Sequence, residues 1–267
     1  MARNKLNQER PHGTREWALH NVNCCTGCGN DCRYCYAKSM AVRFGRMAPE
    51  EWKNERIRDK DVAKSYRYMG GTVMFPSAHD ITPRNFLGCF IVLEKLLKAG
   101  NDVLVVSKPD FNCIRRICDG LCTYKSQILY RFTIGASEDG ILKFWEPNAP
   151  AYEERRRALR YAFDAGFKTS VSVEPMLDSQ NIEYLVDDLS PLVTDSIWIG
   201  KMNQIRRRVE ITDDRVAEEV LRIEQGQTEE RIKKVFESLK NNPIVKWKDS
   251  IKKVVGIKAP EEPGMDV

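Results

Sequence analysis

Three cysteines with the spacing C-x3-C-x2-C, Cys28, Cys32 and Cys35, are the residues of this 267-residue chain best suited to chemistry. Thiolates are soft ligands that favour iron–sulfur clusters. Because a cubane cluster has four irons, three cysteine ligands leave one iron open to an external ligand, as in catalytic metal sites. A small molecule with an amino and a carboxylate group could chelate that iron and receive an electron. The spacing therefore predicts a catalytic [4Fe-4S] centre held by these three residues.

The same segment allows a second, non-catalytic interpretation. Cys25 and Cys28 form one C-x2-C pair and Cys32 and Cys35 form another, so four thiolates could close a zinc or ferredoxin-like site. Zinc ribbons usually place about 12–20 residues between their pairs, whereas three residues separate these two. The odd total of nine cysteines argues against a disulfide framework. A structural metal site or an electron carrier is therefore the alternative from a different functional class.

Composition limits the kind of protein that this chain can be. The chain has 43 Lys and Arg against 38 Asp and Glu, a net charge of +5, which permits nucleic-acid partners without requiring them. Its 10 Phe, 9 Tyr and 5 Trp accompany regular apolar runs, so a mainly disordered chain is not expected. No apolar stretch approaches the ~18 residues of a membrane span, and the polar start lacks the apolar core of a secretory signal. We therefore expect a cytoplasmic protein with no membrane association.

The elements that must position the cysteines alternate along the chain. Short runs rich in β-branched residues predict six strands, and amphipathic patterns between them predict helices. Strand–helix alternation implies parallel strands joined by helical crossovers. Six such units in about 200 residues fit an open (βα)6 barrel, because a complete eight-unit barrel needs about 250 residues. The predicted strands cover residues 18–24, 72–77, 102–107, 128–135, 169–174 and 195–200.

The sequence pattern changes after residue 204. Residues 205–267 contain helical patterns, a run of three arginines at Arg206–Arg208, and a tail that contains proline and glycine. We therefore predict an α/β protein with a partial TIM-type barrel over residues 1–204 and a helical C-terminal extension and tail over residues 205–267. Acidic residues follow the arginine run at once, so this run fits either a solvated face or a phosphate-binding surface.

The cysteine motif and its position resemble the radical S-adenosylmethionine (radical SAM) superfamily, whose signature is C-x3-C-x-aromatic-C after the first barrel strand. Tyr34 occupies the aromatic position, and the alternation extends the resemblance over about residues 18–204. The resemblance implies that one electron from the cluster cleaves S-adenosylmethionine into methionine and a 5′-deoxyadenosyl radical, which abstracts hydrogen from a substrate. It also implies that Tyr34 packs near the adenine and that an external donor, flavodoxin-like or ferredoxin-like, supplies the electron.

Two turns resemble the spore photoproduct lyase branch of that superfamily. The segment Phe75–Asp80 is similar to the Ser-x-x-Asp turn that follows the second strand in this branch. The resemblance implies that Ser77 holds the methionine amino group and that Asp80 orients it, with His79 as a further cofactor-binding candidate. His79 and Asp80 also fit an ordinary helix start. After the third strand, Lys108 lies in a turn similar to the branch's Thr/Ser-Lys-Ser, which implies that it pairs with the methionine carboxylate.

One position departs from the lyase branch. The resemblance would place a hydrogen-donating cysteine two residues before the serine of the second-strand turn, where this chain has Phe75. Phenylalanine cannot donate a hydrogen atom as a thiol does, so thymine-dimer repair by that mechanism is not expected. Tyr36, beside the last cluster cysteine, fits either a hydrogen-atom relay or packing around the cluster. The expected substrate is a nucleic acid that is modified or repaired, or alternatively a small molecule or peptide.

Further candidates lie at the ends of the later predicted strands. Because the carboxyl ends of barrel strands point into the mouth where substrates bind, Glu174 after the fifth strand and Lys201 after the sixth are catalytic candidates. Ser137, after the fourth strand, is a candidate for contacting the ribose of the cofactor. Glu174 and Lys201 also fit ordinary surface turns.

A second group of cysteines raises the question of an auxiliary cluster. Cys113, Cys118 and Cys122 are separated by five and four residues. On a helix these steps leave Cys118 and Cys122 on one face and Cys113 well away from it, at ~100° per residue. Free cysteines are also common buried residues. The sequence therefore allows both a second cluster and simple core packing for these three.

Overall fold

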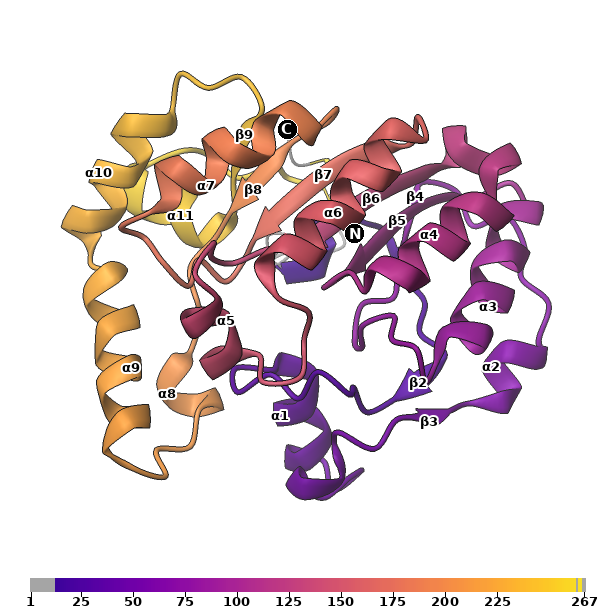
Figure 1. The fold of residues 1–267 in the computed structure, drawn as a ribbon, viewed down its shortest axis with the longest axis horizontal. Helices are drawn as coiled ribbons and strands as arrows, with labels where there is room; N and C mark the ends of the chain where they lie inside the picture. Colours follow the sequence, from indigo (N-terminus) through magenta and orange to yellow (C-terminus); the bar gives the residue numbers. More distant parts are fainter. Residues whose placement is uncertain (1–12, 263, 266–267) are drawn as a thin grey trace, which may run out of the picture.

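The computed structural model describes residues 13–262, 264 and 265, and its main feature is a seven-stranded parallel sheet (Figure 1). The strands of this sheet lie side by side in chain order, and each pairs in parallel with its neighbour, so a crossover joins every successive pair. The two end strands do not pair with each other in the described residues, so the barrel is partial and open. The strands are β1 (His20–Asn21), β4 (Thr72–Phe75), β5 (Asp102–Ser107), β6 (Ile128–Thr133), β7 (Lys168–Val173), β8 (Ile197–Ile199) and β9 (Val245–Trp247).

Helices connect successive strands and pack on the outer face of the sheet (Figure 1). Their apolar faces and alternate strand residues form one large core. None of the described helices has the length and apolar character needed to cross a membrane. The helices of this outer layer are α3 (Phe86–Lys98), α4 (Phe111–Gly120), α6 (Tyr152–Asp164), α7 (Ile182–Leu189), α10 (Glu229–Leu239) and α11 (Asp249–Val255).

The remaining helices are short or lie around the carboxyl ends of the strands. They include α1, which follows the cysteine segment directly, and α8 and α9, which follow β8 (Figure 1). The α-helices are α1 (Tyr36–Arg43), α2 (Asp59–Ala63), α5 (Asp139–Trp145), α8 (Ile205–Arg208) and α9 (Asp214–Gly226). The 3₁₀ helices are η1 (Gly13–Glu16), η2 (Pro49–Glu51), η3 (Cys122–Gln127) and η4 (Ser190–Leu192).

The opposite face of the sheet forms the inside of the partial barrel. Because strand side chains alternate between faces, Met74 and Leu104 point away from the large core and pack against Ala18 of the N-terminal segment. The neighbouring Trp17 packs edge-on against Trp198, with ring centroids 5.8 Å apart. The N-terminal segment therefore fills part of the barrel interior.

A buried lysine joins the two edges of the sheet. Lys248 directly follows β9 and is 1% exposed. Its Nζ lies 2.9 Å from Glu16 Oε1 and 3.4 Å from Glu174 Oε2, and it donates to the Gly13 carbonyl oxygen at 3.1 Å. Because Glu16 precedes β1, this ion pair links the two end strands of the open barrel.

The predicted six strands are confirmed, with β1 and β8 shorter than expected. The seventh strand, β9, lies inside the expected C-terminal extension and pairs with β8. Three residues are too few to show an alternating pattern, so the sequence does not predict this strand. The same is true of a short antiparallel pair formed by β2 (Cys25–Thr26) and β3 (Arg56–Ile57). Residues 205–267 also contribute to the large core, through Val235 and Trp247 among others.

Candidate functional site

The loop between β1 and α1 carries the three cysteines of the predicted cluster. The β2–β3 pair holds this loop against the segment before α2. The Cys28 N–H donates to the Trp52 carbonyl oxygen at 2.8 Å, and the Gly29 N–H donates to Glu55 Oε1 at 2.7 Å. Gly27 has a φ of +84°, and a Cβ there would lie 2.6 Å from the Trp52 oxygen, so only glycine fits. The loop is therefore fixed by main-chain contacts rather than by the cysteines alone.

The thiols of these cysteines suit a metal cluster. Cys28 and Cys32 are each 5% exposed, and Cys35 is half-buried at the N-terminus of α1. Burial raises the pKa of all three thiols above the ordinary value. Thiolates at buried positions need a compensating positive charge, which cluster irons supply. The donor set therefore fits an iron–sulfur cluster.

The spacing of the thiols also distinguishes a site for a metal cluster from a site for a single metal ion. In a mononuclear site, metal–sulfur bonds of about 2.3 Å bring the ligand atoms within about 4 Å of one another. Among the described residues, Cys28, Cys32 and Cys35 do not form a group whose ligand atoms all lie within 4.8 Å. This wider spacing is consistent with a centre that contains several metal ions.

Cys25, the fourth thiol of the alternative zinc site, has a different environment. It lies in β2, and its Sγ contacts the carbonyl oxygens of Thr26 at 3.5 Å and Gly27 at 3.9 Å. Burial and the negative charge of Glu55 raise the pKa of this thiol to about 12. The described residues contain no compact ligand group that includes Cys25.

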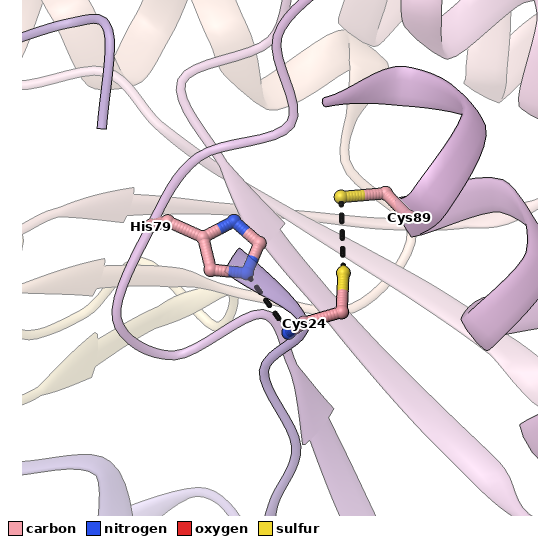
Figure 2. A group of neighbouring side chains, drawn as sticks. All are labelled: Cys24, His79 and Cys89. Atoms are coloured by element: carbon pink, nitrogen blue, oxygen red, sulfur yellow. Dashed lines mark hydrogen bonds between the residues drawn. The ribbon is translucent and has the colours of Figure 1, made fainter. Parts of the chain in front are cut away.

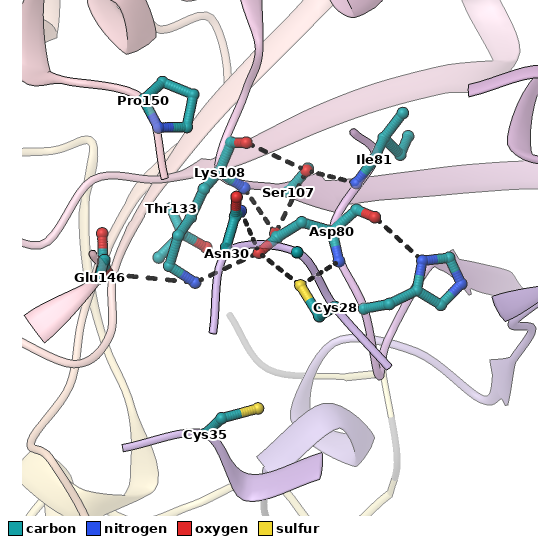
Figure 3. Close-up of polar contacts among 12 residues, drawn as sticks. Cys28, Asn30, Cys35, Asp80, Ile81, Ser107, Lys108, Thr133, Glu146 and Pro150 are labelled. Atoms are coloured by element: carbon teal, nitrogen blue, oxygen red, sulfur yellow. Dashed lines mark hydrogen bonds and ion pairs between the residues drawn. The ribbon is translucent and has the colours of Figure 1, made fainter. Parts of the chain in front are cut away.

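A buried carboxylate, Asp80, connects the cysteine loop to the end of β5 (Figure 3). Asp80 Oδ1 accepts from the Lys108 N–H at 2.7 Å and from Ser107 Oγ at 3.2 Å. Its Oδ2 accepts from Asn30 Nδ2 at 2.8 Å and lies 3.7 Å from Cys28 Sγ. Burial alone would raise the pKa of this carboxyl, but the Lys108 charge and these hydrogen bonds hold it below its usual value. Asp80 is therefore an ionised anchor beside the cluster loop.

Lys108 supplies the positive charge of this region. Its Nζ lies 3.6 Å from Asp80 Oδ2, 4.0 Å from Glu146 Oε1 and 5.7 Å from the centroid of the Tyr34 ring (Figure 3). Burial would lower the pKa of the ammonium group, but the charge of Asp80 outweighs burial and keeps the pKa well above its ordinary value. The group is a permanent cation that is only 11% exposed.

Glu146 and Arg155 complete the charge balance, and neither belongs to a sequence motif that predicts a role in the site. Glu146 is 1% exposed and Arg155 is fully buried, with Arg155 Nη2 2.6 Å from Glu146 Oε2. The Tyr34 hydroxyl donates to Glu146 Oε1, and the Tyr34 ring packs against Trp145. These contacts fix the aromatic side chain of the cysteine motif. The network thus contains two carboxylates, Asp80 and Glu146, and two cations, Lys108 and Arg155, so it has no net charge.

The predicted turn after β4 is present and is held by a residue that the sequence analysis did not single out. Asn23 Oδ1 accepts from the N–H groups of Ser77 and Ala78, both at 2.8 Å. Asn23 Nδ2 donates to Ser77 Oγ at 2.9 Å. Ser77 is thus positioned close to the cysteine loop.

The His79 side chain contacts the main chain of Asp80 rather than its carboxylate. Its Nε2 accepts from the Cys24 N–H at 3.3 Å, and its Nδ1 lies 3.0 Å from the Asp80 carbonyl oxygen (Figure 2). These contacts correspond to a neutral ring with the proton on Nδ1. The structure groups His79 with Cys24 and Cys89, all three of which are buried.

The other predicted site residues lie around the ends of the later strands. Glu174 follows β7 and pairs with Lys248. Lys201 follows β8, and its main-chain N–H donates to Ser250 Oγ at 3.0 Å. Ser137 is half-buried after β6. Tyr36, at the start of α1, is 58% exposed.

The second cysteine group does not assemble a site in the described part of the chain. Cys113 and Cys118 are buried in α4, whereas Cys122 is exposed. The Cys118 thiol donates to the Tyr130 hydroxyl at 3.5 Å. No compact group of candidate ligands among the described residues includes any of the three. Cys113 and Cys118 are therefore core residues.

The family model of the Radical SAM superfamily matches residues 22–192. The chain belongs to the radical SAM superfamily. This match extends from the end of β1 to the end of η4 and includes the cysteine loop and the turns after β4 and β5. The protein is therefore a radical SAM enzyme that uses a [4Fe-4S] cluster and S-adenosylmethionine and depends on an external reductant.

Two curated relatives are similar in sequence, and neither is characterised. One is the uncharacterized protein ORF301 of Acidianus two-tailed virus, 24% identical over 245 residues, which are 84% of this chain and 79% of the relative. The other is the uncharacterized protein MJ0683 of Methanocaldococcus jannaschii, 25% identical over 178 residues, which are 65% of this chain and 67% of the relative.

Solved radical SAM structures share the fold. A mutant of spore photoproduct lyase is similar with a TM-score of 0.57 and 14% identity, over 91% of this chain and 79% of the other. A lyase mutant with bound AdoMet and dinucleoside spore photoproduct has a TM-score of 0.51 and 13% identity, over 82% and 64%. SuiB from Streptococcus suis, bound to S-adenosylmethionine, has a TM-score of 0.54 and 10% identity, over 90% and 52%.

Proposed function

We propose that this radical SAM enzyme modifies or repairs a nucleic acid, with Cys28, Cys32 and Cys35 as the cluster ligands. These three cysteines would hold a [4Fe-4S] cluster that, once reduced, would supply the electron for cleaving S-adenosylmethionine into methionine and a 5′-deoxyadenosyl radical. The contribution of the chain is to bind and orient the cofactors and to exclude water from them.

The neutral network beside the cysteine loop supports a binding site for S-adenosylmethionine. Lys108 is a buried cation that can pair with the methionine carboxylate. Ser77, held by Asn23, can accept from the methionine amino group, and Asp80 keeps Lys108 and the turn in place. We assign the adenine to the Tyr34 side of the network and the ribose to Ser137.

A surface of arginine and aromatic side chains carries the nucleic-acid part of the proposal. We call it the basic rim; it consists of Tyr36, Arg43, Phe44, Arg46 and Arg208. Tyr36 and Phe44 are 58% and 55% exposed. The Arg208 guanidinium lies 5.3 Å from the Tyr36 ring centroid, and those of Arg43 and Arg46 lie 5.7 Å and 5.3 Å from that of Phe44. Exposed aromatic rings among cations are the arrangement by which proteins stack bases and contact phosphates.

The basic rim lies beside the loop that carries the predicted cluster ligands. Tyr36 follows Cys35 directly, so nucleotides bound on the rim would lie next to the cluster loop. Neither α1 nor α8 contains an acidic residue. We assign a hydrogen-atom relay to Tyr36 and contacts with the substrate to Glu174 and Lys201 at the ends of β7 and β8.

A cysteine series tests the cluster assignment. Replacing Cys28, Cys32 or Cys35 by alanine should abolish the iron and sulfide of the anaerobically reconstituted protein, whereas the matched Cys25→Ala variant should keep both. If Cys25→Ala also loses the cluster, a four-thiolate site replaces the catalytic assignment.

Isotope transfer tests the substrate. The reduced protein is incubated with S-adenosylmethionine and either RNA or DNA from cells grown in D2O. Transfer of deuterium into 5′-deoxyadenosine is the expected result for one of the two polymers. Formation of unlabelled 5′-deoxyadenosine, together with no binding of either polymer at low salt, would reject the nucleic-acid substrate and leave the radical chemistry intact.

A radical reaction on a small molecule or peptide is the second candidate. Phe75 favours it, because this side chain is fully buried at the end of β4 and provides no thiol of the lyase type. SuiB, which is similar in fold, has been solved with a bound precursor peptide. We further propose a cytoplasmic, flavodoxin-like or ferredoxin-like electron donor, which suits a chain with nine free cysteines.

A further inference from the structure

A second group of potential metal ligands is formed by residues other than the three cysteines of the cluster (Figure 2). Cys24 comes from the loop after β1, His79 from the turn after β4, and Cys89 from α3. Their ligand atoms all lie within 4.8 Å of one another, and the three residues are 0%, 6% and 0% exposed. Two cysteines and one histidine are a donor set typical of zinc.

The geometry fits one metal ion rather than a cluster or a disulfide. Cys24 Sγ and Cys89 Sγ are 3.7 Å apart. Zinc–sulfur bonds of about 2.3 Å at tetrahedral angles place two sulfurs about 3.8 Å apart. A disulfide requires about 2.05 Å, so the two thiols would have to move together and lose two electrons to an oxidant.

The histidine is oriented as a metal ligand would be. Its Nδ1 lies 3.0 Å from the Asp80 carbonyl oxygen, which accepts the ring proton and leaves the lone pair of Nε2 on the side of the thiols. Metal-bound histidines almost always donate their second ring N–H in this way. The hydrogen bond that Nε2 accepts in its place, from the Cys24 N–H, is long at 3.3 Å.

A candidate fourth donor lies beside these three residues. Asn85 Oδ1 accepts from Cys89 Sγ at 3.3 Å and from the Thr82 N–H at 3.0 Å, and Asn85 is 1% exposed, so a metal would replace the thiol proton at this oxygen. Two thiolates, a neutral imidazole and an amide oxygen around Zn²⁺ have no net charge. A neutral site is what the surrounding apolar core, which includes Phe75 and Phe86, can accommodate without a further counter-ion.

We propose that Cys24, His79 and Cys89 bind a structural zinc ion, with Asn85 as the fourth ligand. The ion would tie together three segments, and two of them, the cysteine loop and the turn after β4, carry residues of the candidate radical site. Cys24 is four residues before Cys28 in the cluster loop, and His79 is adjacent to Asp80. The zinc site would therefore fix the cluster loop against the turn that carries Asp80.

Metal analysis tests this site independently of catalysis. The full chain is purified after growth with zinc, and its zinc content is measured by mass spectrometry. One zinc per chain should be present in the wild type and in a triple variant in which Cys28, Cys32 and Cys35 are alanine. It should be lost in Cys89→Ser and His79→Ala but kept in Cys118→Ser, a matched change of another buried cysteine in the same core.

A second measurement avoids variants that fail to fold. Co²⁺ added to the metal-free triple variant should give thiolate-to-cobalt charge-transfer absorption at one equivalent. Absence of zinc from the wild type, zinc that disappears in the triple variant, or equal zinc in Cys89→Ser would each overturn the proposal. A peptide linked through Cys24 and Cys89 in protein alkylated without reductant would overturn it in favour of a disulfide.

Discussion

Charges are paired differently in two regions of the molecule. One is the buried network at the ends of β4 and β5, and the other is the basic rim. In the network, Lys108 and Arg155 each face a carboxylate and are almost fully removed from water. On the rim, Arg208 contacts the exposed ring of Tyr36 and has no carboxylate within 4.0 Å among the described ion pairs. The difference indicates that a fixed arrangement of paired charges suits one small cofactor, whereas a cation without a carboxylate partner, such as the half-buried Arg208, is able to pair with an anion from solution.

Of the changes considered, replacing Lys108 should cause the largest loss of stability and of cofactor binding. Lys108→Met leaves Asp80 and Glu146 buried without their shared cation, so we expect a loss of about 3–5 kcal/mol in the free energy of unfolding and loss of S-adenosylmethionine binding. Chemical denaturation and calorimetric titration measure the two effects. Lys143→Met, at an exposed lysine, is the control and should change stability by less than about 0.5 kcal/mol. Equal effects of Lys108→Met and Lys143→Met would contradict a contribution of the buried network to stability and cofactor binding.

Replacing Glu146 should cause a smaller loss in the free energy of unfolding. Glu146→Gln removes the charge that faces Arg155 but keeps an oxygen that accepts hydrogen bonds, so we expect a loss of about 2–3 kcal/mol. Cofactor affinity should also fall, because Tyr34 loses its charged acceptor. Glu153→Gln, on the exposed side of α6, is the control. Unchanged cofactor affinity in Glu146→Gln would separate Tyr34 from adenine binding.

The pH dependence of stability should report on Asp80. Because the folded-state pKa of this carboxyl lies below its usual value, its contribution is complete above the unfolded pKa of about 4 and is lost as the pH falls through the folded pKa. The difference in unfolding free energy between the wild type and Asp80→Asn should thus be constant near neutral pH and shrink in acid. Urea denaturation at several pH values measures it. A difference that first shrinks above pH ~6 would contradict the shift.

The smallest expected effect concerns the basic rim. Arg208→Gln should weaken nucleic-acid binding modestly and reduce the slope of log affinity against log salt by about 1. Arg206→Gln is the matched control, because Arg206 in the same helix already pairs with Glu224. Fluorescence anisotropy across a salt series provides both slopes. Identical slopes for the two variants would remove Arg208 from the binding surface.

The sequence predicts the sheet well where each strand is long enough to show its pattern. β5 has the predicted bounds, residues 102–107, because a run of β-branched residues there is bounded by charge. β9 escapes prediction because three residues with one lysine between two apolar side chains also fit a helix or a loop. Its place is determined by pairing with β8, which is a long-range contact that no local pattern encodes.

The candidate site also contains both predictable and unpredictable residues. Those that belong to a short motif, such as Cys28 and Lys108, can be predicted from the sequence. Arg155 is not, because it lies in the run Glu153–Arg157, which looks like a solvated helix face. Only the packing of α6 against the sheet shows that one arginine of this run points inward to Glu146. Asn23 is missed for a similar reason, since its partners lie in a turn over fifty residues away.

The buried contact between Lys248 and Glu16 has a consequence for how molecules reach the barrel interior. It joins the segment before β1 to the segment after β9, so these two outer strands cannot separate without breaking a buried ion pair and leaving the Glu16 carboxylate without its lysine. Entry into the barrel interior between β1 and β9 would therefore require this buried ion pair to break.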